Sequence, residues 1–134
     1  MAKTALVVDD VPYARQIIKD ILTSAKYIVI GEASNGDEAV RMYGELKPDF
    51  VTMDVVMPEK GGIEATRNIM DNNKEARIII VSAMAHEHLL MDAISAGARD
   101  YILKPFSKED LLKAVVKALQ KDETNAKKGA SAKA

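Results

Sequence analysis

Acidic, hydroxyl and amino side chains stand directly after short apolar runs at four places in the chain. The set comprises Asp9, Asp10, Asp54, Ser82 and Lys104. Three carboxylates gathered at one point repel one another, so they should be protonated, separated or bound to a cation. Oxygen ligands suit Mg²⁺, which retains water molecules and can still accept a phosphate oxygen. The pattern therefore predicts a Mg²⁺ site, provided that the fold brings these residues together.

Asp54 is the natural nucleophile of this set. It stands inside the apolar run 50–57, where an unpaired carboxylate with a purely structural role would be costly. Carboxylates form aspartyl-phosphate intermediates, so the reaction is chemically available. Lys104 would place a positive charge against one phosphoryl oxygen, and Ser82 would donate a hydrogen bond to another. We therefore expect Asp54 to accept a phosphoryl group, assisted by Lys104 and Ser82.

Five apolar runs of strand length alternate with longer amphipathic stretches. Their apolar character is nearly continuous, as in strands that helices cover on both faces. This alternation predicts an open, doubly wound α/β sheet of five parallel strands. Ligands of such sheets bind beyond the carboxyl ends of the strands, where the five side chains would meet. The predicted strands are residues 5–8, 28–30, 50–53, 78–81 and 101–103.

The stretches between the runs carry apolar residues at helical spacing. Ser107 and Asp110 predict a capping box for the last helix, which we expect to end near Lys121. Lys104 precedes Pro105, and such a pair at a strand end could hold a cis peptide bond that directs the lysine. The expected inward faces are Ile17, Ile18, Ile21 and Leu22 in the first helix, and Leu111, Leu112, Val115, Val116 and Leu119 in the last.

The composition limits the possible partners and the number of domains. Residues 122–134 contain no large apolar side chain, which predicts a disordered tail or an interaction arm after a single domain of residues 1–121. The net charge of −1 provides no global attraction to nucleic acid or to anionic membranes. Cysteine is absent, and neither a secretory signal nor an apolar run long enough to span a bilayer is evident. We expect a cytoplasmic protein without membrane insertion.

The chain contains several short motifs: Val7-Val8-Asp9-Asp10, Thr52-Met53-Asp54, Met57-Pro58, Ser82-Ala83-Met84, Gly97-Ala98-Arg99-Asp100-Tyr101 and Lys104-Pro105-Phe106. Together they make the chain resemble the receiver domains of two-component response regulators, over residues 3–121. The resemblance implies a flavodoxin-like (βα)5 sheet with strand order 2-1-3-4-5. It implies that Asp54 is the phosphoacceptor, that Asp10 is a direct Mg²⁺ ligand with Asp9 acting through water, and that the carbonyl of Val56 is the backbone ligand.

The resemblance also implies how the phosphoryl group becomes a signal. Ser82 would move toward it, and Tyr101 would move inward and change the face formed by the fourth helix, fifth strand and fifth helix. The absence of an output domain favours control of motility in chemotaxis. The donor would be a CheA-type sensor histidine kinase, and the listener a motility switch or adaptor protein, with a phosphatase as a possible third partner. The protein would be a monomer, not an enzyme in the usual sense, with weak self-phosphorylation and self-dephosphorylation.

One departure from the family pattern concerns phosphate lifetime. The positions two after Asp54 and two after Ser82 often hold polar residues that handle the attacking water, and here they are Val56 and Met84. We expect slower self-dephosphorylation than in members with polar groups at these positions.

Three alternatives remain to be weighed. A haloacid dehalogenase-type phosphatase would need a second aspartate where Val56 stands, and a flavin-binding module would need a hydroxyl- and glycine-rich loop in place of Asp9-Asp10-Val11-Pro12. The segment 59–62 predicts a turn, without the spacing of a nucleotide-binding glycine loop. A stand-alone receiver that serves as a phosphorelay intermediate or an enzyme regulator has the same chemistry, and the sequence separates it poorly from a chemotaxis regulator.

Overall fold

Five parallel strands form one sheet in the order β2-β1-β3-β4-β5, and helices alternate with them along the chain. The computed structural model describes the backbone of residues 2–133 and the side chains of residues 2–120. The predicted doubly wound fold and its strand order are confirmed. The elements are β1 (Thr4–Val8), α1 (Pro12–Ser24), β2 (Ile28–Ala33), α2 (Gly36–Leu46), β3 (Phe50–Met53), α3 (Gly62–Asn72), β4 (Ile78–Ser82), α4 (Glu87–Ala96), β5 (Asp100–Leu103) and α5 (Lys108–Lys133).

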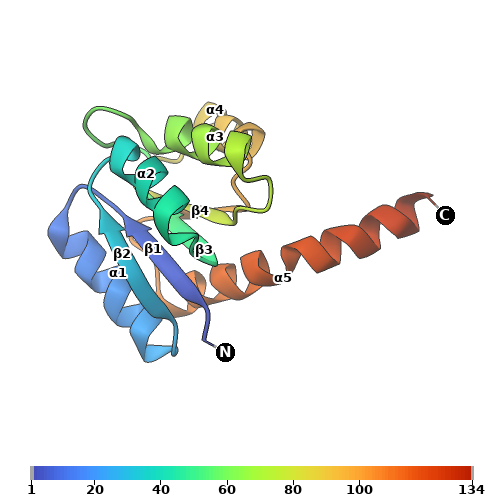
Figure 1. Cartoon of the computed structure of the whole chain (residues 1–134), viewed down its shortest axis with the longest axis horizontal. Helices are drawn as coiled ribbons and strands as arrows, with labels where there is room; N and C mark the ends of the chain where they lie inside the picture. The colour runs from blue at the N-terminus through green and yellow to red at the C-terminus, as the bar shows by residue number, and fades with distance from the viewer. Residues whose placement is uncertain (1, 134) are drawn as a thin grey trace.

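Two layers of helices cover the sheet, and each has its own apolar cluster. Figure 1 shows α2, α3 and α4 on one face, with α1 and the first part of α5 on the other. Alternate residues of β3 divide between the layers: Val51 and Met53 pack toward the first, and Phe50 toward the second. This two-sided burial explains why the strands are apolar throughout.

The edge strand β2 is longer than the sequence predicts. It runs from Ile28 to Ala33 and pairs with β1, with an irregularity in register between Ala5 and Leu6. Glu32 is exposed at this edge and is therefore tolerated, whereas a Cβ atom on Gly31 would lie 2.8 Å from side-chain atoms of Met42 and Leu46 on α2. These two residues interrupt the apolar run and end the predicted strand too early.

The helices largely follow the predicted pattern, with two corrections to their inward faces. Ile17 on α1 and Val116 on α5 are exposed, because each lies at the margin of its apolar stripe. The capping box is confirmed: the Asp110 amide donates to Ser107 Oγ at 3.0 Å, and the Ser107 amide to Asp110 Oδ2 at 3.4 Å. The peptide bond between Lys104 and Pro105 is cis.

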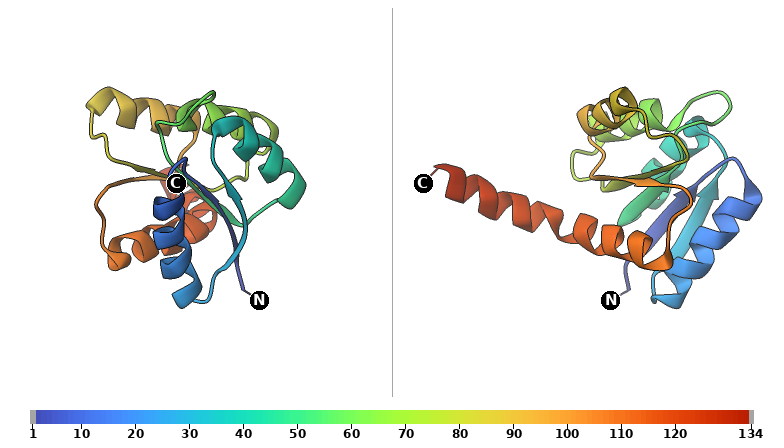
Figure 2. Two further views of the ribbon diagram at one scale, coloured as in Figure 1. Left: turned by 90° about the vertical axis from the view of Figure 1, so that its left-hand side faces the viewer. Right: turned by 180° about the vertical axis from the view of Figure 1, so that it is seen from behind.

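The last helix extends beyond the predicted end near Lys121. Its backbone is helical to Lys133, and Figure 2 shows this part projecting away from the sheet. The side chains of residues 121–133, and all of residue 134, lie outside the described residues. The division into a domain of residues 1–121 and a disordered tail of residues 122–134 therefore stays a prediction. Among the described residues, no helix is both long and apolar enough to cross a bilayer.

Candidate functional site

The carboxylates of Asp9, Asp10 and Asp54 meet at the carboxyl end of the sheet. One oxygen from each lies within 4.8 Å of the others. Asp9 follows β1 and Asp54 follows the neighbouring strand β3, so the parallel pairing of these strands sets the two side by side. The pairing continues past the strand ends, since the Asp54 amide donates to the Val8 carbonyl at 3.0 Å. The strand order thus produces the cluster that the sequence predicts.

Lys104 completes this cluster from the end of β5. Its Nζ lies 2.7 Å from Asp9 Oδ2 and 3.8 Å from Asp54 Oδ2. The Lys104 amide donates to the Ser82 carbonyl at 2.8 Å, which fixes the base of the side chain beside β4. Asp9 and Asp54 are 1% and 8% exposed, whereas Asp10 is exposed to solvent. Two buried carboxylates therefore share a single ammonium group.

The excess of negative charge contributes to a raised pKa of Asp54. Burial, followed by the neighbouring charge of Asp9, raises the pKa of Asp54, while Lys104 and the Val55 amide act in the opposite direction, and together these effects move the pKa from 3.8 to about 6. The Val55 amide donates to Asp54 Oδ1 at 2.9 Å. A divalent cation would offset the repulsion that keeps this pKa high. The donor set consists only of oxygen atoms, which fits Mg²⁺.

Ser82 and Tyr101 both contact the loop between β4 and α4. Ser82 is buried at the end of β4, and its Oγ accepts a hydrogen bond from the Met84 amide at 3.1 Å. The hydroxyl of Tyr101, on β5, donates to the Met84 carbonyl at 2.6 Å. Met84 is therefore bonded through both of its backbone polar groups. The two predicted switch residues are connected through this one peptide segment.

The loop after Asp54 carries Val56, which is 61% exposed beside the acidic cluster. The loop closes on itself, because the Gly62 amide donates to the Val55 carbonyl at 2.9 Å. A Cβ atom on Gly62 would lie 1.8 Å from the Asp54 carbonyl oxygen, so only glycine permits this approach. The sequence predicts no more than a turn here. A glycine at the first position of a helix, soon after a candidate nucleophile, is the signal that could have revealed it.

A second set of contacts attaches the tip of this loop to α2. The Gly36 amide donates to the Lys60 carbonyl at 2.8 Å, and Lys60 Nζ lies 3.4 Å from Asp37 Oδ1 and also donates to Asn68 on α3. The loop that presents the Val56 backbone is thus held at both its base and its tip.

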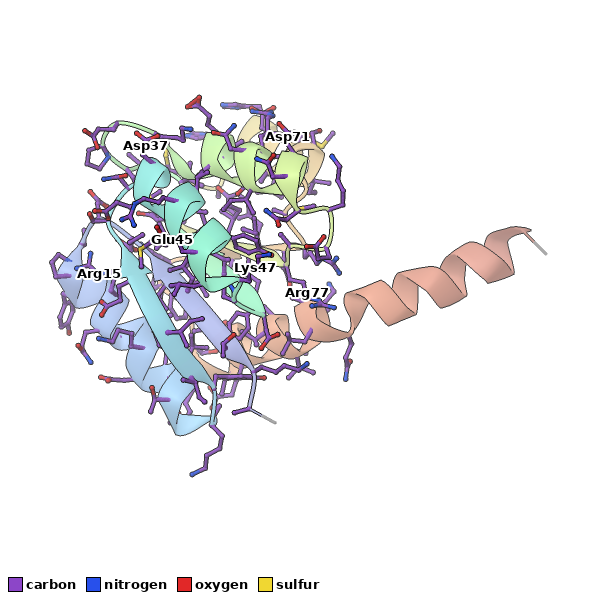
Figure 3. All side chains as sticks on the ribbon, in the orientation of Figure 1. Arg15, Asp37, Glu45, Lys47, Asp71 and Arg77 are labelled. Carbon is purple, nitrogen blue, oxygen red and sulfur yellow. The ribbon has the colours of Figure 1, made fainter. Side chains whose placement is uncertain are left out.

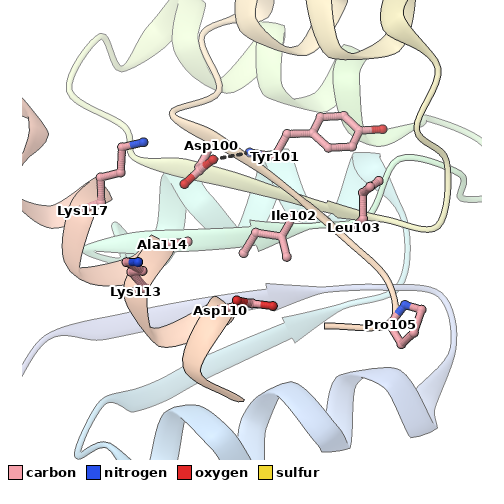
Figure 4. A pocket seen from close by; sticks show the side chains of 9 residues that line it. All are labelled: Asp100, Tyr101, Ile102, Leu103, Pro105, Asp110, Lys113, Ala114 and Lys117. Carbon is pink, nitrogen blue, oxygen red and sulfur yellow. Dashed lines mark hydrogen bonds between the residues drawn. The ribbon is translucent and has the colours of Figure 1, made fainter. Parts of the chain in front are cut away.

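A separate hollow of about 510 Å³ lies between β5 and α5 (Figure 4). Tyr101, Leu103, Pro105 and Lys113 are among the residues that line it, and none of the three clustered aspartates is. It adjoins the predicted signalling face and not the site of chemistry.

Comparisons with known proteins agree with this geometry. Residues 5–116 match the family model of the response regulator receiver domain. The chain belongs to this family. It is similar to the chemotaxis protein CheY of Thermotoga maritima, with 50% identity over 87% of this chain and 98% of that protein. For CheY of Bacillus subtilis the identity is 47%, over 89% of this chain and 99% of that protein.

A solved structure of a relative has the same fold. It is the CheX–CheY–BeF3–Mg²⁺ complex of Borrelia burgdorferi, which is 36% identical with a TM-score of 0.82, over 84% of this chain and 86% of that one. The chain is therefore a receiver domain of a CheY-like response regulator, of a kind consistent with two-component signalling.

Proposed function

We propose that this receiver domain is the response regulator of a chemotaxis system. A CheA-type sensor histidine kinase phosphorylates Asp54 in the presence of Mg²⁺, and the product controls the motility apparatus. The observation that carries the proposal is the convergence of three carboxylates and Lys104 at the end of the sheet. The similarity to chemotaxis proteins over nearly their whole length supports the choice of pathway.

The transfer follows from the placement of Asp54. A carboxylate oxygen of Asp54 forms a bond to phosphorus while the phosphorus–nitrogen bond of the donor phosphohistidine breaks, and the histidine nitrogen keeps the electron pair. Asp9, Asp10, Asp54 and the carbonyl of Val56 would hold Mg²⁺, which when bound neutralises charge on the phosphoryl oxygens. Lys104 lies close enough to Asp54 to exchange its partner Asp9 for a phosphoryl oxygen.

The signal leaves through the face formed by α4, β5 and α5. Ser82 turns toward the phosphoryl group, which ends its hydrogen bond to the Met84 amide, and Tyr101 then moves inward. The face already exposes large apolar side chains, a feature typical of contact surfaces. They are Met91 and Ile94 on α4 and Leu103 on β5. A motility switch or adaptor protein is the proposed listener, and a phosphatase ends the signal.

The protein acts as a cytoplasmic monomer and is not a conventional enzyme, although it catalyses slow phosphorylation of itself from small donors and slow loss of the phosphoryl group.

Incubation with radiolabelled acetyl phosphate and Mg²⁺ tests the chemistry. Wild type becomes labelled, whereas the Asp54→Ala variant and wild type with excess chelator do not. Equal labelling of Asp54→Ala, or none of wild type, would contradict the proposal.

A second experiment tests the pathway separately from the chemistry. The protein is immobilised with beryllofluoride and Mg²⁺, and bound cell proteins are compared with those retained by the untreated protein. A motility switch component or adaptor found only in the first sample supports chemotaxis. A histidine phosphotransfer protein or a regulated enzyme would indicate the phosphorelay or enzyme-regulator alternative.

A further inference from the structure

Arg15 on α1 contacts the backbone between the two adjacent aspartates of the site. Its Nη1 donates to the carbonyl oxygen of Asp9 at 2.7 Å. This carbonyl belongs to the peptide group that joins Asp9 to Asp10. Arg15 lies on α1 (Figure 3), and its side chain is only 18% exposed. Arg15 therefore contacts the backbone of this turn, while its side chain lies outside the acidic cluster.

Glu32 on β2 holds the other edge of the same guanidinium group. Arg15 Nε donates to Glu32 Oε1 at 3.0 Å, and Lys19 Nζ donates to Glu32 Oε2 at 2.8 Å. These hydrogen bonds, first that of Lys19, lower the pKa of Glu32 and keep it ionised at neutral pH. The planar guanidinium can bind a carboxylate and a carbonyl at once because its donors point in fixed directions. Glu32, Arg15 and the Asp9–Asp10 peptide thus form one hydrogen-bonded series from β2 to the acidic turn.

We propose that Arg15 is a positioning residue for the divalent cation, acting by fixing the orientation of the Asp9–Asp10 peptide. The inference rests on the proposed Mg²⁺ site and adds a residue outside its ligand set. Partners in the layer behind the ligands commonly change metal affinity by roughly 10- to 100-fold when removed. Arg15 is itself cationic, so simple repulsion would make its removal strengthen Mg²⁺ binding. Removal of Arg15 should therefore weaken Mg²⁺ binding if the residue acts by positioning, and strengthen it if the residue acts only by repulsion.

Lys19 provides a matched control. It has the same charge, lies one helical turn further along α1 and pairs with the same carboxylate. It differs in that the Asp9 carbonyl is bonded to Arg15. Lys19→Met thus removes a charge and a bond to Glu32 while leaving the contact under test in place.

Calorimetric titration with Mg²⁺ alone, without a phosphodonor, measures the effect. We expect Arg15→Met to weaken Mg²⁺ binding by about tenfold, Lys19→Met to change it less than about twofold, and Arg15→Lys to recover part of the loss. In the cation-free protein, the ¹⁵N-amide resonance of Asp10 should move in Arg15→Met and stay in place in Lys19→Met. Unfolding curves check that each variant is folded.

If Arg15→Met fails to fold, Glu32→Gln takes its place, because it leaves Arg15 present and removes the charge that orients it. This variant should weaken Mg²⁺ binding by a few fold. The inference would be overturned if folded Arg15→Met, or Glu32→Gln in its place, bound Mg²⁺ as tightly as wild type. That result would leave the proposed function intact. Failure of wild type to bind Mg²⁺ would overturn both.

Discussion

Two halves of the sheet end differ in how firmly they are held. The acceptor half comprises β1, β3 and the loops that follow them, and the signalling half comprises the β4–α4 loop, α4, β5 and α5. In the acceptor half Asp9 and Asp54 are buried, and the Asp54 loop is closed by the Gly62 amide and attached to α2 through Lys60. In the signalling half α4 leaves Met91 and Ile94 about 60% exposed.

Under the proposed function, this difference separates the part that carries out phosphoryl transfer from the part that contacts partners. Phosphoryl transfer needs oxygen atoms that are already in place, because a small displacement of a reacting group is costly. A surface that partners recognise in two forms must be exposed and have bonds that can be exchanged. The backbone of Met84 meets this need, since its amide is hydrogen-bonded to Ser82 and its carbonyl to Tyr101. Substitutions in the acceptor half should therefore affect stability and labelling, and those in the signalling half should mainly affect binding.

The largest effect is expected from Gly62→Ala. The new methyl group would meet the Asp54 carbonyl, a backbone atom that cannot turn aside, so the loop must move. We expect a loss of about 3 kcal/mol or more in the free energy of unfolding, measured by urea denaturation.

Gly44→Ala is the control for this substitution. Gly44 lies in α2 with open space around its Cα, so alanine should stabilise the protein by about 0.5 to 1 kcal/mol through helix propensity. A Gly62→Ala variant as stable as wild type would show that the acceptor half is more adaptable than its contacts indicate.

The second prediction concerns pH and the charge of Asp54 without divalent cations. The folded protein keeps a proton on Asp54 up to about pH 6, whereas the unfolded chain releases it near 3.8. Asp54 therefore contributes no loss of stability below about pH 4, and its destabilising effect grows as the pH rises through about 6 and is then constant. Asp54→Asn should be more stable than wild type by about 2 to 3 kcal/mol at pH 7, with the difference vanishing near pH 4.

Unfolding by urea at several pH values in excess chelator measures this difference. Adding Mg²⁺ at pH 7 should narrow the gap, because it stabilises the folded wild type by binding to Asp54. If the difference in free energy of unfolding between the two proteins is constant from pH 4 to pH 7, the pKa of Asp54 is not raised by folding.

The sequence predicts the carboxylates, Lys104 and Ser82 because each follows a recognisable strand. Strand pairing then converts positions along the chain into neighbours in space. The same reasoning does not predict the contacts of Arg15 or the role of Gly62, for two different reasons. The contacts of Arg15 depend on how α1 packs beside β2, which no local spacing encodes. The role of Gly62 depends on the path of a loop that returns to its own starting point. The position of Ile17 at the edge of an apolar stripe is likewise decided by packing.

A smaller effect is expected from Val56→Asn. Val56 lies in the acceptor half but is exposed, so the change should leave stability and the initial rate of labelling with acetyl phosphate unaltered. A side-chain amide there can orient the attacking water, and we expect phosphate loss to become faster by a few fold, up to about tenfold. Release of phosphate after removal of the donor measures this rate, with Val56→Ala as the control for lost bulk. An unchanged or slower rate in Val56→Asn would count against a role for this position.

The smallest effect on chemistry is expected from Tyr101→Phe, which removes the hydroxyl that donates to the Met84 carbonyl. Loss of one such bond should cost about 1 kcal/mol or less. Mg²⁺ affinity and labelling of Asp54 should stay within about twofold of wild type, because the Tyr101 hydroxyl contacts none of the groups proposed to bind the cation or the phosphoryl oxygens. Tyr13→Phe, at an exposed position on α1, is the control for removing a tyrosine hydroxyl. Partner binding by the beryllofluoride form should change only in Tyr101→Phe. A large fall in labelling instead would mean that the hydrogen bond between Tyr101 and Met84 already sets the acceptor geometry before phosphorylation, and the two halves would then form a single unit.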